Sequence, residues 1–155
     1  MNREKHTKIL IINGVNLALL GTREVDIYGC VSFDEYLPKL QNQFPDTDIE
    51  LFQSDSADEI ANKITTSNGF DGILLNAGAF THTSIIIADA VRAVKTPVVE
   101  IHISNLFGRE NYRKNNVLSA ACSGFISGFG LLGYNLGIES ILLKKNSDCI
   151  KLFKV

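Results

Sequence analysis

The sequence predicts an α/β protein with a doubly wound, five-stranded parallel sheet. Apolar runs rich in Ile, Leu and Val recur about every 20 to 40 residues, and stretches with helical periodicity lie between them. Continuous apolar runs are typical of strands buried on both faces, and strands separated by helices pair in parallel through right-handed crossovers. The two patterns together favour helices on both faces of one sheet.

The predicted strands coincide with the apolar runs, and three of these runs end in polar clusters. The runs cover residues 8–13, 48–53, 71–76, 97–103 and about 122–127. Because the carboxyl ends of parallel strands meet at one edge, where open α/β sheets bind ligands, we expect the polar clusters to form a site there. The clusters are Asn13-Gly14-Val15-Asn16, the segment from Asn76 to Ser84, and Glu100-Ile101-His102-Ile103-Ser104.

The helical stretches complete a flavodoxin-like sandwich with strand order 2-1-3-4-5. They cover residues 33–43, 57–68, 83–94 and about 129–144. Ser32 followed three residues later by Glu35 predicts a capping box, and Thr83 or Ser84 is expected to cap the third helix. The stretch Ile85 to Ala88 is apolar nearly all round. It therefore predicts a helix buried on more than one side, with another subunit as a possible cover.

Length and composition favour one soluble domain spanning residues 1–155. The chain has 155 residues, of which 45% are apolar, and a net charge of −2, which gives no electrostatic case for nucleic acid or an anionic membrane. Three cysteines without a CxxC motif or a Cys/His cluster predict no disulfide framework and no zinc site, and fit a cytoplasmic protein. The polar start Met1–His6 and the lack of a long apolar run predict neither a signal peptide nor a membrane span.

One connection, residues 14–31, is long for this fold and is a candidate active-site lid. It contains Arg23 and Tyr28. A unit charge about 4 Å from a phenol, at an effective dielectric of about 20, contributes about 4 kcal/mol. That is enough to lower the pKa of Tyr28 until the phenolate serves as a base near neutral pH. An isolated Arg and Tyr in a loop are more often surface residues.

The sharpest local signal is Glu100-Ile101-His102-Ile103. Strand alternation places Glu100 and His102 on one face and the two isoleucines on the other. A charge at the end of a buried strand is costly unless it is paired. We therefore expect Glu100 to orient His102 and hold it protonated as a general acid. A buried pair without chemical function is the alternative.

Other polar residues at the same edge predict ligand contacts. Asn76 and His82 flank the small residues Ala77-Gly78-Ala79, which let a ligand approach the backbone closely, although a single His near a helix start is often structural. Arg109 and Arg113, four residues apart, are expected to share a face of a short helix, where one could bind a carboxylate bidentately or both could be solvated. The loop after the first strand lacks both GxGxxG and GxxxxGK[ST], so a nucleotide site is disfavoured.

Spaced motifs over nearly the whole chain resemble the type II dehydroquinases (type II 3-dehydroquinate dehydratases). The matching stretches are Asn13-Gly14, Asn16-Leu17, Leu19 to Glu24, Ile27-Tyr28-Gly29, Phe52-Gln53-Ser54, Asn76 to Ser84, Ala88-Asp89-Ala90, Pro97 to Asn105, Arg109-Glu110, Arg113, Gly128-Phe129-Gly130 and Gly133-Tyr134.

The resemblance implies a lyase that dehydrates 3-dehydroquinate to 3-dehydroshikimate in the shikimate pathway of aromatic amino acid biosynthesis. Its implied catalytic residues are Tyr28 as the base, Arg23 as the cation that stabilises the phenolate, and His102 as the acid oriented by Glu100. Asn16 is implied to hold the enolate oxygen through water. The implied substrate-binding residues are Asn76, His82, Ile103, Ser104 and Arg113, with Asp89 reaching the site of a neighbouring subunit.

The resemblance also implies a homododecamer built from trimers that uses no metal, no cofactor and no Schiff-base lysine. The chain departs from the family pattern at Val15, Ala18 and Val25 in the lid and in the segment 55–58, Asp-Ser-Ala-Asp. Two alternatives follow. One is a weakly active or inactive paralogue that binds the ligand in a regulatory or structural role. The other is a signalling module on the same fold, which the lack of an acidic pair after the first strand disfavours.

Overall fold

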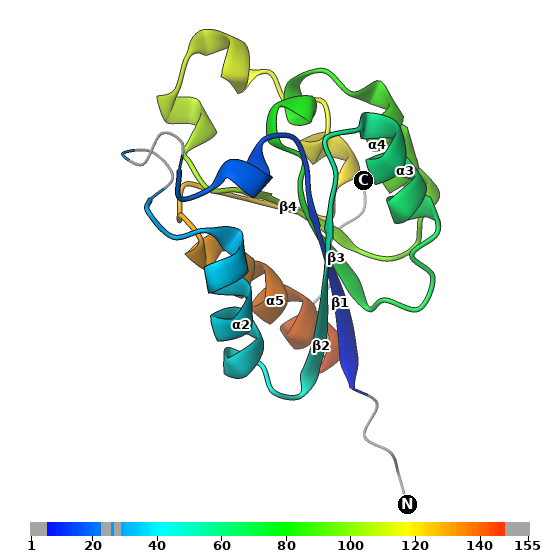
Figure 1. The fold of residues 1–155 in the computed structure, drawn as a ribbon. Helices are drawn as coiled ribbons and strands as arrows, with labels where there is room; N and C mark the ends of the chain where they lie inside the picture. Colours follow the sequence, from blue (N-terminus) through cyan, green and yellow to red (C-terminus); the bar gives the residue numbers. More distant parts are fainter. Residues whose placement is uncertain (1–5, 23–25, 27–28, 148–155) are drawn as a thin grey trace, which may run out of the picture.

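The structure, a computed structural model, describes residues 6–22, 26 and 29–147, and within them it contains a five-stranded parallel sheet. The strand order β2-β1-β3-β4-β5 confirms the predicted fold (Figure 1). Asn13 pairs in register with both Gln53 and Asn76, so the ends of three strands lie level. The strands are β1 (Thr7–Asn13), β2 (Thr47–Gln53), β3 (Gly72–Asn76), β4 (Val98–His102) and β5 (Gly124–Ser127).

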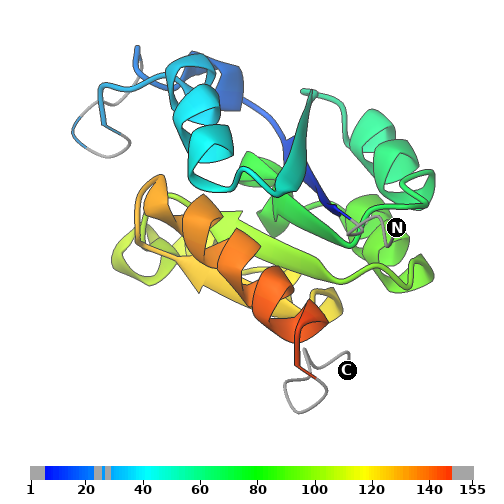
Figure 2. The same cartoon turned by 90° about the horizontal axis from the view of Figure 1, so that it is seen from below.

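Helices cover both faces of the sheet. α3 (Ala57–Thr65) and α4 (Ile85–Ala93) lie on one face, and α2 (Phe33–Gln43) and α5 (Leu132–Lys145) lie on the other (Figures 1 and 2). Each face has its own apolar cluster, because alternate residues of the central strands point to opposite sides: Leu10 and Ile12 belong to the first cluster and Ile9 and Ile11 to the second. The predicted helices are confirmed apart from their ends.

Local side-chain contacts explain where two helices begin. Ser32 and Glu35 form the predicted capping box at α2. Ser84, not Thr83, caps α4 by accepting a hydrogen bond from the backbone of Ile87. α5 begins three residues later than predicted, since Gly128 and Gly130, with φ of 94° and 58°, form a turn before it.

One surface of α4 remains uncovered in the single chain. Ile87, Ala88 and Val91 are buried, whereas Ile85 and Ile86 are 67% and 56% exposed. The single chain therefore buries only one side of this helix. Within the described ranges, no helix combines the length and the apolar character needed to cross a membrane.

Short 3-10 helices extend the carboxyl edge of the sheet. They are η1 (Leu17–Leu19), η2 (Gly78–His82), η3 (Leu106–Gly108), η4 (Asn111–Lys114) and η5 (Ser119–Ala121). The expectation of one helix carrying Arg109 and Arg113 was wrong: Arg109 ends η3 and Arg113 lies in η4. The extended backbone of Arg109 and the φ of −58° and ψ of 150° at Glu110 separate the two turns.

The loops after β1 and β3 interlock at two glycines. A Cβ on Gly14 would lie 2.4 Å from the carbonyl oxygen of Ala77, and one on Gly78 would lie 2.6 Å from that of Val15. The amide of Gly14 donates to the carbonyl of Asn76 at 2.7 Å. Only residues without a side chain permit this approach, which brings two polar clusters together.

Candidate active site

A pocket lies beyond the carboxyl ends of β1, β3 and β4, where the polar clusters were expected to meet. The loops that follow these strands form its walls. Its lining residues are Val15, Asn16, Leu17, Leu19, Leu20, Asn76, Gly78, Ala79, His82, His102, Ile103, Ser104, Leu106, Arg109 and Arg113. The structure thus brings together seven of the predicted site residues: Asn16, Asn76, His82, His102, Ile103, Ser104 and Arg113.

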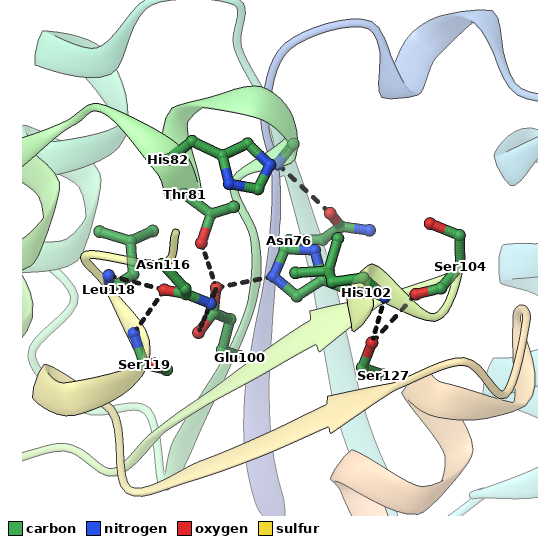
Figure 3. A network of polar contacts seen from close by, with 12 residues as sticks. Asn76, Thr81, His82, Glu100, His102, Ser104, Asn116, Leu118, Ser119 and Ser127 are labelled. Carbon is green, nitrogen blue, oxygen red and sulfur yellow. Dashed lines mark hydrogen bonds and ion pairs between the residues drawn. The ribbon is translucent and has the colours of Figure 1, made fainter. Parts of the chain in front are cut away.

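Glu100 and His102 form the predicted pair at the base of the pocket. Glu100 is fully buried and His102 is 5% exposed, with 2.7 Å between His102 Nε2 and Glu100 Oε1. The Thr81 hydroxyl also donates to Glu100 Oε1, and Asn116 Nδ2 lies 3.0 and 3.2 Å from the two carboxylate oxygens (Figure 3). An ionised carboxylate only accepts hydrogen bonds, so this set of donors fits a buried, charged Glu100.

The hydrogen-bond partners assign the protons of the two histidines on the pocket wall. His102 Nε2 faces the Glu100 carboxylate, an acceptor, and therefore carries a proton. The second ring nitrogen, Nδ1, is not used in this contact. His82 Nδ1 lies 2.6 Å from the backbone carbonyl of Asn115, an acceptor, so in His82 the proton is on Nδ1. The two rings therefore turn opposite nitrogens to their protein partners.

Asn76 belongs to a second buried network, which is neutral. Asn76 Nδ2 donates to the Tyr134 hydroxyl at 2.9 Å, and this hydroxyl donates to Asn13 Oδ1 at 2.7 Å. Burial raises the pKa of Tyr134, while its hydrogen bonds with Asn76 and Asn13 lower it, and burial has the larger effect. The amide of Gly78 donates to Asn76 Oδ1 at 3.3 Å. The Asn76 side chain is thus held at both ends against the pocket wall.

Two arginines give the pocket positive charge. Arg113 Nε lies 3.0 Å and Arg109 Nε 3.5 Å from Oε2 of the exposed Glu110. A backbone hydrogen bond at Glu110, and then the charges of Arg109 and Arg113, lower the pKa of its carboxyl. Guanidinium groups bind carboxylates with two parallel hydrogen bonds, so this wall suits an anionic ligand.

Contacts from Gln53 of β2 and from Asp55, beyond its end, hold Asn16 and its loop in an unusual conformation. Its φ of 66° is the only positive value at a non-glycine residue in the described part of the chain. The Asn16 amide donates to Asp55 Oδ1 at 3.1 Å, and Gln53 Nε2 donates to the carbonyl of Gly14 at 2.8 Å. Asp55 lies in one of the segments that depart from the family pattern, and here it supports a loop of the pocket.

The structure does not place four predicted residues on the pocket wall, and one of these, Glu100, reaches the pocket through His102. Asp89 lies on the exposed side of α4 and pairs with Arg92 at 3.2 Å. Arg23 and Tyr28 lie outside the described residues, so their roles stay predictions. Across the described ranges, no group of three or more His, Cys, Asp or Glu side chains is arranged to hold a metal ion.

Sequence reasoning did not assign Thr81, Asn116 or Tyr134 a part in the site. Thr81 is fully buried, although it is polar and follows β3 by a few residues. Asn116 and Tyr134 contact the site from segments far along the chain. A polar residue in the matched stretch from Asn76 to Ser84 was an available signal for Thr81, whereas Asn116 offered none.

Comparisons with known proteins define the class. The family described as "Dehydroquinase class II" matches residues 7–142. A 3-dehydroquinate dehydratase of Chlorobaculum tepidum is 43% identical over 90% of this chain and 97% of that protein. One from Helicobacter pylori strain Shi470 is 43% identical over 87% of this chain and 84% of its own.

Solved structures agree with the sequence matches. The type II dehydroquinase from Butyrivibrio crossotus superimposes with a TM-score of 0.84 at 40% identity, covering 88% of this chain and 98% of its own. That from Propionibacterium acnes gives a TM-score of 0.82 at 34% identity, covering 91% and 97%. The fold and pocket define an α/β protein with a pocket at the carboxyl edge of its sheet, next to a buried Glu–His pair. The chain belongs to the class II dehydroquinase family.

Proposed function

We propose that the protein is a lyase that dehydrates 3-dehydroquinate to 3-dehydroshikimate in the shikimate pathway. The observation that carries this proposal is the buried Glu100–His102 pair on a pocket that two arginines also line. An acid and a cationic wall suit the removal of a hydroxyl group from an anionic substrate. The family membership agrees with this chemistry.

The elimination removes one proton and one hydroxyl group as water. Tyr28, made anionic by Arg23, takes a proton from C2 of the substrate, beside the ketone. The electrons move to the ketone oxygen, and Asn16 stabilises the resulting enolate through a water molecule. The enolate then re-forms the ketone as its electrons form the C1–C2 double bond and the C1–O bond breaks. His102 gives its Nδ1 proton to the departing hydroxyl, which leaves as water, while Glu100 holds the ring through Nε2.

The remaining polar residues of the pocket orient the substrate. Arg113 binds the carboxylate of the substrate. The carboxylate and the hydroxyl groups are also held by Asn76, His82, Ile103 and Ser104. All five line the pocket. Residues 14–31 act as a lid of a single domain, 1–155, and closure of the lid excludes water from the Arg23–Tyr28 pair.

The proposal extends to a homododecamer built from trimers, in which Asp89 reaches the site of a neighbouring subunit. Support comes from α4, where Ile85 and Ile86 are exposed one turn from Asp89. Exposed apolar residues on a helix are typical of interfaces between chains. Sedimentation velocity tests this assembly, and a monomer at micromolar concentration contradicts it.

We also propose a cytoplasmic location and no cofactor or metal. Cys30 and Cys122 are free thiols, which agrees with a reducing compartment. Activity that survives dialysis against a chelator supports the metal-free mechanism. Loss of activity that only added metal restores contradicts it.

The decisive experiment is a turnover assay with purified protein. The product contains a carbon–carbon double bond conjugated to the ketone, so its ultraviolet absorbance follows the reaction at saturating 3-dehydroquinate. We expect turnover in the parent protein and its loss in Tyr28→Phe. Tight binding without turnover in the parent favours a regulatory or structural paralogue instead, and a Tyr28→Phe protein that keeps most of kcat excludes Tyr28 as the base.

A further inference from the structure

We propose that Asn116 is a positioning residue for the acid step, because its amide donates to both oxygens of Glu100, stabilises the ionised carboxylate and so keeps a proton of His102 on Nε2, in the hydrogen bond to Glu100. This inference rests on the proposed function, in which His102 is the acid. Asn116 lies between η4 and η5 and does not line the pocket. It acts through Glu100 and touches no substrate.

The backbone decides the orientation of the Asn116 amide. Its Oδ1 accepts hydrogen bonds from the amides of Leu118 and Ser119, both at 2.8 Å (Figure 3). A side-chain nitrogen in that position would face two other donors, so the oxygen must occupy it. The Nδ2 group is therefore directed at Glu100 by the local fold.

The Nδ2 group contacts both oxygens of Glu100, Oε1 at 3.0 Å and Oε2 at 3.2 Å. An amide nitrogen donates and cannot accept, so a proton on Glu100 Oε2 would face a donor. Oε1 is already occupied by Thr81 and His102. The surroundings of both oxygens thus favour the ionised carboxylate.

An ionised Glu100 in turn assigns the protons of His102. Because the carboxylate only accepts, His102 Nε2 must donate, and the proton available to substrate is the one on Nδ1. If Glu100 took up a proton, it could donate to Nε2 and leave Nδ1 as the protonated nitrogen of a neutral ring. Asn116 excludes that arrangement by stabilising the charge on Glu100.

In the described part of the chain, few titratable groups other than His102 lie near Glu100. Cys122 lies near Glu100 from beyond η5; burial, and then the charge of Glu100, raise the pKa of this thiol. Thr81 contributes a neutral hydroxyl from η2. On the pocket side, His102 shares the wall with His82, Arg109 and Arg113. Asn116 is thus the neutral donor that reaches both oxygens of Glu100.

Asn116→Asp tests the inference with a minimal change in shape. The variant keeps the oxygen that accepts from Leu118 and Ser119, and replaces the donor to Glu100 by a second carboxylate. We expect kcat to fall about tenfold or more with KM changed less than about twofold. The kcat–pH profile should gain one ionisation, because two adjacent carboxylates share a proton.

Asn105→Asp is the matched control. Asn105 Oδ1 also accepts a backbone hydrogen bond, from Phe107 at 3.1 Å, and the side chain does not line the pocket. This change adds the same charge without altering the donors to Glu100. We expect kcat within about twofold of the parent and an unchanged pH profile. Equal losses and equal profiles in the two variants overturn the inference.

A double-mutant cycle separates positioning from a structural role. If Asn116 acts through the charge of Glu100, then Asn116→Asp should change kcat less than about threefold in a Glu100→Gln background. A full tenfold loss in that background overturns the inference, since no carboxylate is then present for Asn116 to stabilise.

Ring-nitrogen NMR of the parent protein gives a test that needs neither turnover nor the variant. The chain has 3 histidines, so few signals need assignment. We expect the neutral ring of His102 to carry its proton on Nε2 and that of His82 on Nδ1. A proton on Nδ1 of neutral His102 overturns the inference even if Asn116→Asp fails to fold. A parent without dehydratase activity overturns the proposed function, whereas the NMR result tests separately whether Glu100 is an ionised acceptor for His102 Nε2.

Discussion

Two buried polar networks lie at the same edge of the sheet, and they differ in charge. The first joins Glu100 and His102 to Thr81 and Asn116, and it holds an ionisable pair. The second joins Asn13, Tyr134 and Asn76, and its groups are neutral amides and a phenol. Both networks are buried, but a buried charge is stable only with an opposite charge or several hydrogen-bond donors, which a neutral group does not require. The comparison separates groups that move a proton from groups that hold the wall of the site.

The largest expected effect comes from removing the charge of the first network. Glu100→Gln should lower kcat about 100-fold or more with a small change in KM, because the ring of His102 loses the partner that sets its protons. Steady-state kinetics with 3-dehydroquinate measure this. A loss confined to KM would assign Glu100 to substrate binding and remove the distinction between the two networks.

Replacing the acid itself gives the companion result. His102→Ala should reduce kcat about 100-fold or more, since proton transfer to the leaving hydroxyl is lost. The matched change His82→Ala, on the same wall, should act mainly on KM because His82 is expected to bind substrate. If the change in KM accounts for the whole loss in His102→Ala, the acid assignment fails.

Disrupting the neutral network should lower the stability of the protein more than its activity. Tyr134→Phe leaves Asn76 and Asn13 without their shared hydroxyl, and an unsatisfied buried polar group costs about 1–3 kcal/mol. We expect a loss of this size in the free energy of unfolding, measured by urea denaturation, and a decrease of less than about tenfold in kcat/KM. Tyr36→Phe is the control: its half-buried hydroxyl lies 2.6 Å from Asn135 Oδ1, and we expect a smaller loss. Equal losses would show that burial of the hydroxyl is unimportant.

An exposed contact gives a third, weaker case. Asp55→Ala removes the acceptor for the amide of Asn16, which lies at φ 66°. Because the bond is exposed, we expect kcat/KM to fall only about threefold, with the thermal midpoint nearly unchanged. Asp58→Ala, in the first turn of α3, should have no effect on kcat/KM. An equal fall in both variants would mean that Asp55 has no specific role at the loop of Asn16.

The two networks also differ in how far sequence predicts them. The Glu100–His102 pair follows from alternation along one strand, a local property, and the strands follow from apolar runs. Thr81 and Asn116 reach Glu100 across 19 and 16 positions, and Tyr134 reaches Asn76 across 58. These contacts depend on how helices and loops pack on the sheet, which no local pattern encodes. For Arg109 and Arg113 the local pattern was misleading. Their spacing predicted one helix, but the extended backbone at Glu110 separates them into two short 3-10 helices.

The smallest expected effect is a dependence of stability on alkaline pH that Tyr36 contributes. Burial raises the pKa of Tyr36 to about 12, above the value of about 10 for a phenol in an unfolded chain. The native state therefore binds this proton more tightly, so the contribution of Tyr36 to stability is fully present below about pH 10. It is lost as the pH rises from about 10 to 12.

Urea denaturation of the parent and of Tyr36→Phe at pH 8, 10 and 11.5 measures this contribution. The parent should lose more unfolding free energy than the variant over that range, because the phenylalanine ring has no proton to release. Tyr134 remains in both proteins, so the effect of burial on its pKa cancels in the difference. Parallel pH dependence in the two proteins would show that the Tyr36 hydroxyl ionises as readily in the fold as in the unfolded chain. The contacts of Tyr36 with α5 would then open before the sheet does.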